Sequence, residues 1–465
     1  MLRLYRHNAW TRIEGLSPAL RERLHWCLAV HLETDVPSKG VRFGRIWMYS
    51  QKWYGSMLHD AHEGDPDRVP AGLTRHVAWI AQQQGEAVEV YDARLRPRES
   101  YPWHSMQQLQ WRPYQDEVHA AILEHGTGVI VASPRAGKTA MAARALDVLG
   151  KPAVCIAPSV PIVRQTYETF CRMFGEKMVA RLDGQATEEQ RQIHRPIVVA
   201  TVASAIRQSE SWWQTREALI LDEVHHAASN SWHEINDLAK HIYHRLGFTG
   251  TYFRTGNDDL AMHAVTGDVI YQIGVRDLVA QGYLAAPKVF FRNYKAPRVS
   301  DGPWHDLYER GIVKMESRNR LVVSTAEGLM ERGDRIIVLT RRRNHADVLG
   351  SMIANSVVVK GGEGALTSDA VRDFLRGRHQ VLVGTTVIGE GVDVPAASAL
   401  IYASGGSDGV QLIQSYFRPM TRHADKPTGR IYDFVDTQHR LLDKHSTERM
   451  DAAREHLGNE NVFTY

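Results

Sequence analysis

Two short motifs, each directly after an apolar strand pattern, constrain the fold of this chain more than any other feature. Residues 132–139 read Ala-Ser-Pro-Arg-Ala-Gly-Lys-Thr; they follow the apolar run 128–131 and precede an alanine-rich helical stretch at 140–149. A strand, a glycine-containing loop and a helix in this order form a phosphate-binding loop, because backbone N–H groups at the helix N-terminus hold anionic oxygens. Lys138 would contact the terminal phosphates of a nucleotide, and the Thr139 hydroxyl would bind Mg²⁺.

The second motif, Asp-Glu-Val-His at 222–225, ends another buried-strand pattern at 218–221. Asp222 stands where a carboxylate can bind a metal ion, and Glu223 where a base can activate water. Because both motifs occur in order at strand ends, they predict a site that binds and hydrolyses a nucleoside triphosphate. For His225 two readings stay open, a relay from this site to another domain and an ordinary hydrogen-bonded structural histidine.

Composition places the chain among globular proteins of more than one domain. Its 465 residues are 43% hydrophobic and 23% charged, with a formal net charge of +3, so any nucleic-acid binding must come from local basic patches. The three cysteines, Cys27, Cys155 and Cys171, match neither a disulfide framework nor a zinc site. Apolar runs stay well below the roughly 18 residues of a membrane span, and the N-terminus lacks a signal pattern. We therefore expect a cytoplasmic protein.

Three blocks follow one another along the chain. Residues 1–105, the N-terminal block, contain six of the eleven tryptophans and none of the nucleotide motifs. Ser17-Pro18 predicts a helix start with apolar helical spacing over 20–32. A strand-like stretch at 43–54, a second helix to about residue 84 and a closing strand at 88–91 complete a small α+β domain. Residues 106–290 and 291–465 form the second and third blocks.

Both later blocks alternate short apolar strands with helical segments, which predicts two parallel sheets covered by helices. Two such halves in tandem also predict a nucleotide cleft between them. In the second block the expected strands are 129–132, 153–157, 197–200, 219–221 and 246–249. In the third block they are 335–340, 356–360, 380–385, 399–403 and 429–435.

Other polar residues follow these strands or their connecting helices. Gln115 has the amide needed to read an adenine edge, although an ordinary glutamine at a helix start is the alternative. The Thr249-Gly250-Thr251 segment can link the nucleotide pocket to a nucleic-acid path through its hydroxyls. Further candidates for that path are Pro158, Arg164 and Thr201.

In the third block, the loop from Thr385 to the Glu390-Gly391-Val392-Asp393 segment carries turn glycines and a well-placed carboxylate. Gln414 then precedes Arg418 and Arg422. An arginine contributed across a domain cleft can stabilise charge on a transferring γ-phosphate.

Two basic segments are candidates for contact with nucleic acid. Arg42, Arg45 and Lys52 alternate with aromatic residues, which favours phosphate contact and base stacking, although core packing equally explains the aromatics. Arg341 begins a run of three arginines after the 335–340 strand, and either a backbone contact or a solvated charge run explains it.

This ordered set resembles the DExH branch of the superfamily 2 helicases over residues 108–440, and within it the UvsW-like, XPB-like and RecG-like motors. The resemblance rests on the Arg-Pro-Tyr-Gln start at Arg112, the Asp-Glu-Val-His box, the Thr-Gly-Thr segment and the Glu-Gly-Val-Asp-Val-Pro loop. It implies an α/β fold of two tandem RecA-like domains behind the small α+β domain. The N-terminal block itself resembles the accessory DNA-binding domain of UvsW-like helicases only weakly, because no sharp motif carries the likeness.

The sequence departs from the family pattern in three places. The phosphate loop has Ala132 and Pro134, and Gly250 stands where alanine is usual. The last motif lacks the usual first arginine and glycine and spaces its arginines by four, so either Arg418 or Arg422 is the finger, with Arg418 preferred. The resemblance further implies catalytic roles for Lys138, Asp222, Glu223 and Gln414, and nucleotide contacts from Arg112, Gln115, Ser133, Pro134, Arg135, Ala136, Gly137, Lys138, Thr139, Gly391 and Asp393.

The function implied is an ATP- and Mg²⁺-dependent DNA helicase or translocase that remodels branched or forked DNA in recombination, replication or repair. We expect it to act as a monomer in a bacterial or phage-infected cell. An RNA helicase is the alternative within this class. A non-catalytic ATP-binding clamp is the alternative from another class, and the presence of Glu223 argues against it, because a clamp needs no base.

Overall fold

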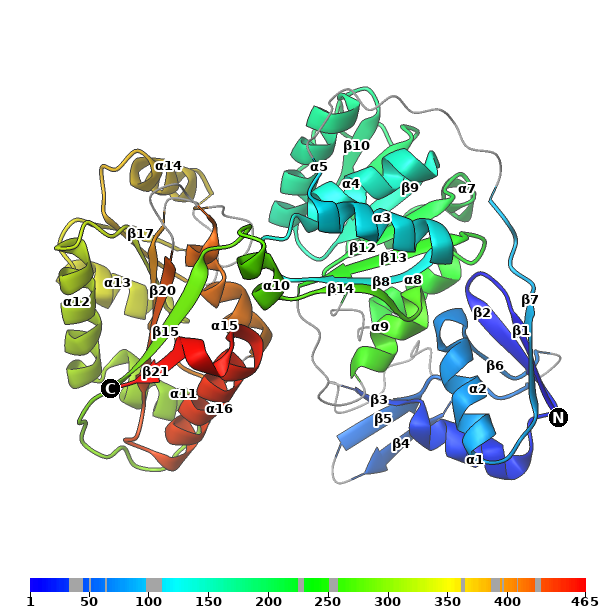
Figure 1. Ribbon diagram of the computed structural model, residues 1–465, viewed down its shortest axis with the longest axis horizontal. Coiled ribbons are helices and arrows are strands. Elements are labelled where there is room, and N and C mark those ends of the chain that lie inside the picture. The colour runs from blue at the N-terminus through cyan, green and yellow to red at the C-terminus, as the bar shows by residue number, and fades with distance from the viewer. Residues whose placement is uncertain are drawn as a thin grey trace. The chain divides into compact units, whose positions relative to one another are not determined.

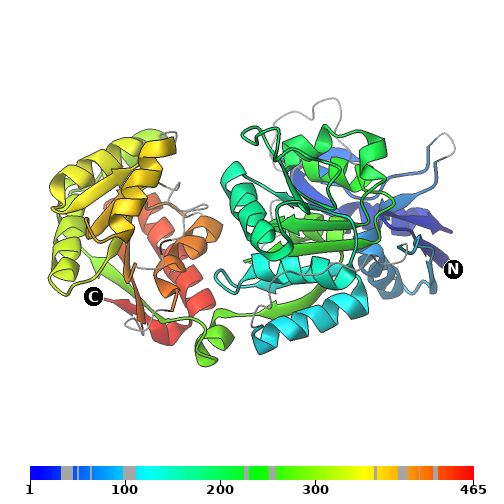
Figure 2. The ribbon, with the colours of Figure 1, turned by 90° about the horizontal axis from the view of Figure 1, so that it is seen from above.

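The computed structural model describes residues 1–32, 45–49, 52–62, 65–97, 111–224, 230–250, 258–360, 364–385, 394, 397–407, 409–422 and 428–465. The chain divides into two compact units, residues 1–273 and 274–465 apart from three loop residues. Each unit contains one seven-stranded sheet, and helices lie on both faces of each sheet (Figures 1 and 2). No helix in the described part of the chain combines the length and apolarity that a membrane crossing needs.

The N-terminal block contains two small sheets and two helices. A four-stranded mixed sheet has the order β6-β2-β1-β7, and a three-stranded antiparallel sheet has the order β3-β5-β4. The elements are β1 (Leu2–Arg6), β2 (Trp10–Glu14), α1 (Pro18–Cys27), β3 (Ala29–Leu32), β4 (Ile46–Tyr49), β5 (Lys52–Ser56), β6 (Arg68–Pro70), η1 (Ala71–Leu73), α2 (Thr74–Gln83) and β7 (Val88–Asp92).

The predicted first helix is confirmed at its start and wrong at its end. Ser17 caps α1 by accepting a hydrogen bond from the Leu20 N–H at 3.4 Å, and Pro18 occupies the first turn, as the sequence predicts. The helix ends at Cys27, however, and residues 29–32 form β3 against β5. Apolar spacing alone could not separate the last helical turn from a short buried strand.

The first lobe, residues 111–273, is built on a wholly parallel sheet with the order β10-β11-β9-β12-β13-β8-β14. Its elements are α3 (Pro113–His125), β8 (Thr127–Ala132), α4 (Lys138–Leu149), β9 (Ala153–Ala157), α5 (Val160–Phe174), β10 (Val179–Leu182), β11 (Ile197–Thr201), α6 (Val202–Ile206), α7 (Glu210–Trp213), β12 (Ala218–Asp222), α8 (Asn230–Leu238), β13 (His244–Thr249), α9 (Asp258–Thr266) and β14 (Val269–Ile273). The five strands expected in this block are confirmed, and β10 and β14 are added at the two edges.

The second lobe, residues 274–465, repeats the plan with the parallel order β17-β18-β16-β19-β20-β15-β21. Its elements are α10 (Val275–Ala280), β15 (Ala286–Asn293), α11 (Trp304–Tyr308), η3 (Glu309–Val313), α12 (Glu316–Met330), β16 (Ile336–Leu339), α13 (Arg343–Met352), β17 (Ser356–Val359), α14 (Gly364–Leu375), β18 (Val381–Gly384), β19 (Ala399–Tyr402), α15 (Gly409–Tyr416), η5 (Arg418–Met420), β20 (Thr428–Val435), α16 (Arg440–Leu457), η6 (Asn459–Asn461) and β21 (Val462–Thr464). The predicted fold class is confirmed. The boundaries at 105 and 290 stay predictions; residue 290 lies within β15.

The N-terminal block and the first lobe share a hydrophobic core. Leu260, Ala261 and Ala264 of α9 are buried among the apolar residues of α1, α2 and β1. A methyl group built on Gly72 of η1 would lie 1.7 Å from the backbone oxygen of His263, so only glycine allows this close approach. Figure 1 shows α9 between the first lobe's sheet and the N-terminal block.

Polar contacts reinforce this junction. The Trp10 indole N–H donates to Asp237 at 3.1 Å, and the Arg6 guanidinium donates to Thr127 at 3.2 Å. The Asn8 amide donates to the backbone oxygen of His241 at 2.5 Å. The block is therefore packed against the first lobe rather than joined to it by a linker alone.

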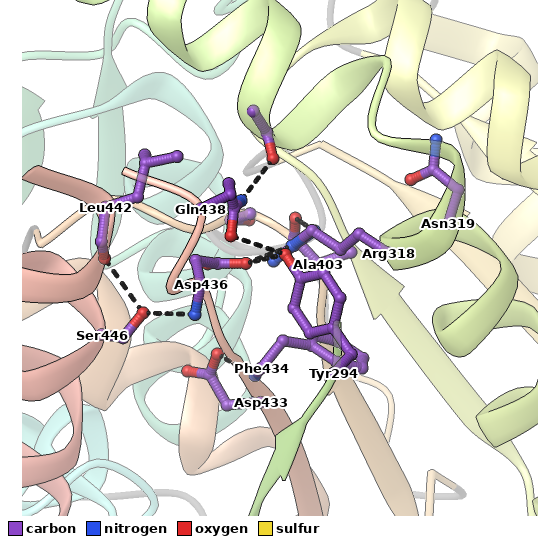
Figure 3. A network of polar contacts seen from close by, with 12 residues as sticks. Tyr294, Arg318, Asn319, Ala403, Asp433, Phe434, Asp436, Gln438, Leu442 and Ser446 are labelled. Carbon is purple, nitrogen blue, oxygen red and sulfur yellow. Dashed lines mark hydrogen bonds and ion pairs between the residues drawn. The ribbon is translucent and has the colours of Figure 1, made fainter. Parts of the chain in front are cut away.

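A buried polar network connects several elements of the second lobe at the carboxyl end of β20 (Figure 3). Arg318 of α12 donates to Asp436 at 2.8 Å and to the backbone oxygen of Ala403 at 2.9 Å, and Tyr294 also donates to Asp436 at 2.7 Å. Close by, Arg449 of α16 forms bonds of 2.9 and 3.0 Å with the two oxygens of Asp433. Charged groups at such depth are stable only when each one is paired.

The Arg449 contacts connect three elements of the second lobe. Burial alone would lower the pKa of this guanidinium, but Asp433 and Asp436 hold the pKa of Arg449 above its usual value. Its Nη1 donates to the Gly406 backbone oxygen at 2.8 Å, and Tyr416 of α15 donates to Asp433 at 2.5 Å. The network therefore fixes α15 and the loop after β19 against α16.

We predict that Arg449→Met lowers the free energy of unfolding of the second lobe by about 3–5 kcal/mol, because Asp433 would be left buried without its cation. Hydrogen exchange of the β19 and β20 amides, followed against temperature, measures this change. Lys444→Met is the matched control, since Lys444 lies on the same helix in an exposed ion pair with Glu448 at 3.7 Å. That control should change stability by at most about 0.5 kcal/mol. Equal effects of the two substitutions would contradict the prediction.

Candidate nucleotide site

Most of the site residues predicted in the first lobe lie at the carboxyl edge of its sheet. Strands β8, β9, β11, β12 and β13 are parallel, so Ser133, Pro158, Thr201, Asp222 and Thr249 all lie at their carboxyl ends. Ligands of open α/β sheets bind at this edge. Residues far apart in the sequence therefore meet there.

The phosphate loop connects β8 to α4 through two left-handed residues. Arg135 has φ 71° and Gly137 has φ 85°, and α4 begins at Lys138 directly afterwards. Ser133 fixes the start of the loop, because its N–H and hydroxyl donate to the Ile273 backbone oxygen at 3.2 and 3.3 Å. The turn leaves the first N–H groups of α4 at its N-terminus, the geometry that binds phosphate oxygens.

Gln115 lies against this loop. Its Oε1 accepts from the backbone N–H of Arg112 at 3.1 Å, which caps α3, and its Nε2 would lie 3.0 Å from a methyl group on Gly137. The side chain is buried. Helix capping and proximity to the nucleotide loop therefore occur together in Gln115, whereas the sequence presented them as alternatives. Arg112 donates to the Tyr114 hydroxyl at 2.9 Å.

An acidic pair faces the lysine of the loop. Lys138 Nζ lies 3.5 Å from Glu223 Oε1, and both side chains are largely buried. Glu223 has φ 50°, a left-handed conformation that is rare for a residue with a side chain, and its N–H donates to Asp222 Oδ1 at 3.0 Å. Strained backbone of this kind concentrates at functional sites. Burial, followed by the charge of Glu223, raises the pKa of Asp222 above its usual range.

These residues fit a magnesium–nucleotide complex. Two carboxylates face one ammonium group, and the nearby donors, Asp222 and Thr139, offer only oxygen, which Mg²⁺ prefers. Among the residues that the structure describes, no three His, Cys, Asp or Glu side chains gather where they could hold a metal ion. A cation at Asp222 would thus need phosphate and water as further ligands, as is usual for Mg²⁺.

The remaining candidates of the first lobe lie on its surface or at strand ends. Thr249 is fully buried, and the Thr201 hydroxyl donates to Ser204 at 3.0 Å. Arg164 is exposed on α5, with its Nε 4.0 Å from Glu168. Pro134, Ala136 and Pro158 lie within the loops that follow β8 and β9, and only Ala136 is fully buried.

In the second lobe, Arg341 and Thr385 follow β16 and β18 at the carboxyl edge of the sheet. Arg341 is exposed and its Nη1 would lie 3.2 Å from a methyl group on Gly406. Thr385 is buried and donates its N–H to the Val359 backbone oxygen at 3.4 Å.

The two finger candidates differ in their surroundings. Arg418 begins η5, directly after α15, and only 8% of its surface is exposed. Arg422 is exposed and its Nη1 donates to the Gly282 backbone oxygen in the turn after α10. Gln414 is half-buried on α15. Arg422 thus has a contact inside its own lobe. The choice of Arg418 over Arg422 as the finger stays a prediction.

Several predicted residues lie outside the described part of the chain. These are Arg42, His225, Thr251, Gly391 and Asp393, and the side chain of Lys52. Arg45 is described, and its Nη1 donates to Glu22 of α1 at 2.6 Å in an exposed ion pair. Sequence reasoning missed Arg449, Asp433 and Arg318, because nothing in a sequence separates a buried arginine on a helix from a solvated one.

Two family models match the chain, "Type III restriction enzyme, res subunit" over residues 108–254 and "Helicase conserved C-terminal domain" over residues 317–420. The chain is 24% identical over 361 residues to the DNA 3'-5' translocase XPB2 of Sulfurisphaera tokodaii. This alignment covers 68% of this chain and 80% of the relative. The chain is 20% identical over 382 residues to the ATP-dependent DNA helicase uvsW of Enterobacteria phage T4, covering 77% and 76%.

A solved fragment of a putative HsdR subunit of a type I restriction enzyme from Vibrio vulnificus matches with a TM-score of 0.56 and 18% identity. The match covers 75% of this chain and 66% of that one, and it supports the paired-lobe fold. The strand–loop–helix motif, the acidic pair and the two family models agree on one assignment. This chain is an ATP-dependent helicase of superfamily 2.

Proposed function

We propose that this chain is a DNA helicase or translocase that remodels branched or forked DNA. The observation that carries the proposal is that Lys138 Nζ lies 3.5 Å from Glu223 Oε1, next to Asp222. ATP hydrolysis needs both a group that binds the phosphates and a base that activates water. The two relatives named above are a DNA translocase and a DNA helicase, which favours DNA over RNA as the track.

In this proposal the first lobe binds ATP and the second completes the site. The N-terminal groups of α4 and the Lys138 ammonium hold the phosphates, and Thr139 and Asp222 hold Mg²⁺, which neutralises phosphate charge when bound. Gln115 reads the adenine, Glu223 accepts a proton from the attacking water, and Arg418 stabilises the charge that develops on the γ-phosphate. His225, Thr249, Thr251, Thr385 and Arg341 would transmit the nucleotide state to the DNA backbone.

Branched DNA suits a motor that bears a second domain packed on its ATP-binding lobe. Branch migration and fork regression exchange equivalent base pairs, so their net cost is near zero although each stacked step is worth about 1.4 kcal/mol. The N-terminal block shares a hydrophobic core with the first lobe, where it can hold one arm of a junction. We assign the activity to a monomer in the cytoplasm of a bacterial or phage-infected cell.

A panel of substrates tests this function. We expect ATP hydrolysis to be stimulated most by forked and four-way DNA, less by single-stranded DNA and least by RNA of matched sequence. Labelled junctions should be resolved by branch migration only when ATP and Mg²⁺ are both present. Stimulation by RNA alone would identify an RNA helicase instead. ATP binding without hydrolysis on every substrate would leave only a nucleic-acid clamp.

A further inference from the structure

The four-stranded sheet of the N-terminal block has one covered and one open face. Its inner face buries Leu2, Leu4, Ile13 and Val69 beneath α1 and α2. The alternate residues of the same strands point the other way. The strand register aligns four of them in one row across the whole sheet, Arg68 of β6, Arg12 of β2, Tyr5 of β1 and Tyr91 of β7.

Three side chains of this row, those of Arg12, Tyr5 and Tyr91, form a continuous stack. The Arg12 guanidinium carbon lies 4.3 Å from the centre of the Tyr5 ring, and the Tyr5 and Tyr91 rings lie 5.0 Å apart with their planes at 13°. Tyr91 is 44% exposed, and β7 is the last strand of the sheet. The stack therefore ends on an aromatic ring at an open sheet edge, where another planar group can extend it.

The charged groups around the stack leave a net charge of one positive unit. The neighbouring row reads Glu14, Arg3 and Glu89. Glu14 forms an ion pair with Arg12 at 2.9 Å, and Glu89 accepts a hydrogen bond from Arg3 at 3.3 Å. Glu89 also accepts the Tyr91 hydroxyl at 2.8 Å. Arg68 lies 4.7 Å from the ring of Trp10 and has no ion-pair partner within the described part of the chain. Three guanidinium groups thus face two carboxylates.

We propose that this face binds a single-stranded DNA segment, with an unpaired base stacked on the outer face of Tyr91. Arg3, Arg12 and Arg68 would contact the flanking phosphates. Aromatic rings that accept a base beside arginines are the usual means of holding unpaired strands without reading their sequence. This inference rests on the proposed function, because the segment is an arm of the motor's own branched substrate. The binding surface differs from the β4–β5 segment that the sequence favoured.

An affinity measurement tests the stack. Tyr91→Ala should weaken binding of an oligothymidylate at low salt by about tenfold, the loss expected when one base loses its aromatic partner. Tyr91→Phe keeps the ring and should bind within about twofold of the parent protein. Trp79→Ala is the matched control, because Trp79 is 62% exposed on α2, on the helical side of the same block. Equal losses for Trp79→Ala and Tyr91→Ala would overturn the proposal.

Photocrosslinking in the unaltered protein gives an independent result. A forked DNA with 5-iodouracil in one single-stranded arm should crosslink to Tyr91, as mapped by mass spectrometry of the modified peptide. Crosslinks confined to other parts of the chain would overturn the proposal. The experiment needs no ATP, so a failed crosslink in a protein that still unwinds forks refutes this surface alone. A protein that crosslinks at Tyr91 but never hydrolyses ATP would refute the motor instead.

Discussion

Glu223→Gln should lower kcat for ATP hydrolysis by about 10²- to 10⁴-fold while ATP still binds with nearly its original affinity. The amide keeps the shape of the side chain beside Lys138, whose Nζ lies 3.5 Å from Glu223 Oε1, but it cannot accept a proton from water. The phosphate contacts proposed for the loop and for Lys138 should be unchanged in this variant. Steady-state hydrolysis with saturating forked DNA measures the rate, and equilibrium binding of a fluorescent ATP analogue measures affinity.

Glu217→Gln is the matched control for this substitution. Glu217 precedes β12, at the opposite end of the strand from Asp222, and lies 3.8 Å from Lys151. Its amide variant should hydrolyse ATP within about twofold of the parent rate, because Glu217 lies at the far end of β12 from the phosphate loop. Thermal unfolding of this variant measures separately the stability lost by weakening its largely buried ion pair with Lys151. A Glu223→Gln protein with the parental rate would remove the base from the proposed mechanism.

Arg418→Ala has the largest expected effect, a fall in kcat of about 10³- to 10⁵-fold, the range measured for arginine fingers. The guanidinium is expected to act on charge that appears only during phosphoryl transfer, so the KM for ATP should change much less than kcat. Arg418→Lys should also be impaired, because an ammonium group cannot form the planar two-point contact. Stopped-flow single-turnover hydrolysis on forked DNA measures the chemical step directly.

Arg422→Ala serves as the comparison. Its guanidinium donates to the Gly282 backbone oxygen, so its loss should change stability slightly and leave kcat within about tenfold. Thermal unfolding of all three variants would reveal any folding defect from the buried Arg418. A greater loss of kcat in Arg422→Ala than in Arg418→Ala would reverse the assignment of the finger.

Most interior strands of both lobes could be predicted from the sequence because burial on two faces makes them continuous apolar runs. The run 153–157 matches β9 residue for residue. The interior strand β15 was missed, because exposed and half-exposed side chains alternate with buried ones along it. Among the edge strands, β17 was predicted at 356–360, but the other edges could not be predicted in the same way. In β14, Val269–Ile273, polar and half-exposed side chains interrupt the apolar pattern, and β21, Val462–Thr464, is too short for any periodicity.

The sequence predicted those residues of the candidate site whose role depends on local spacing along the chain. Lys138, Asp222 and Glu223 each follow a recognisable strand, so a motif was enough to place them at one sheet edge. Arg449 is different, because its partners Asp433 and Gly406 lie 16 and 43 positions away and its burial depends on tertiary packing. The Tyr5–Tyr91 stack likewise requires β1 and β7 to pair across 86 residues, a register that no local pattern encodes.

The shared core between α9 and the N-terminal block has a practical and a mechanical consequence. A truncated motor lacking residues 1–97 would expose Leu260, Ala261 and Ala264 to water, so its insolubility would say nothing about DNA affinity. Point substitutions are therefore the better test of whether the N-terminal block binds DNA. Because residues of α9 and of the N-terminal block are buried in one core, a nucleic-acid arm bound to the block would be displaced together with the ATP-binding lobe in each catalytic cycle.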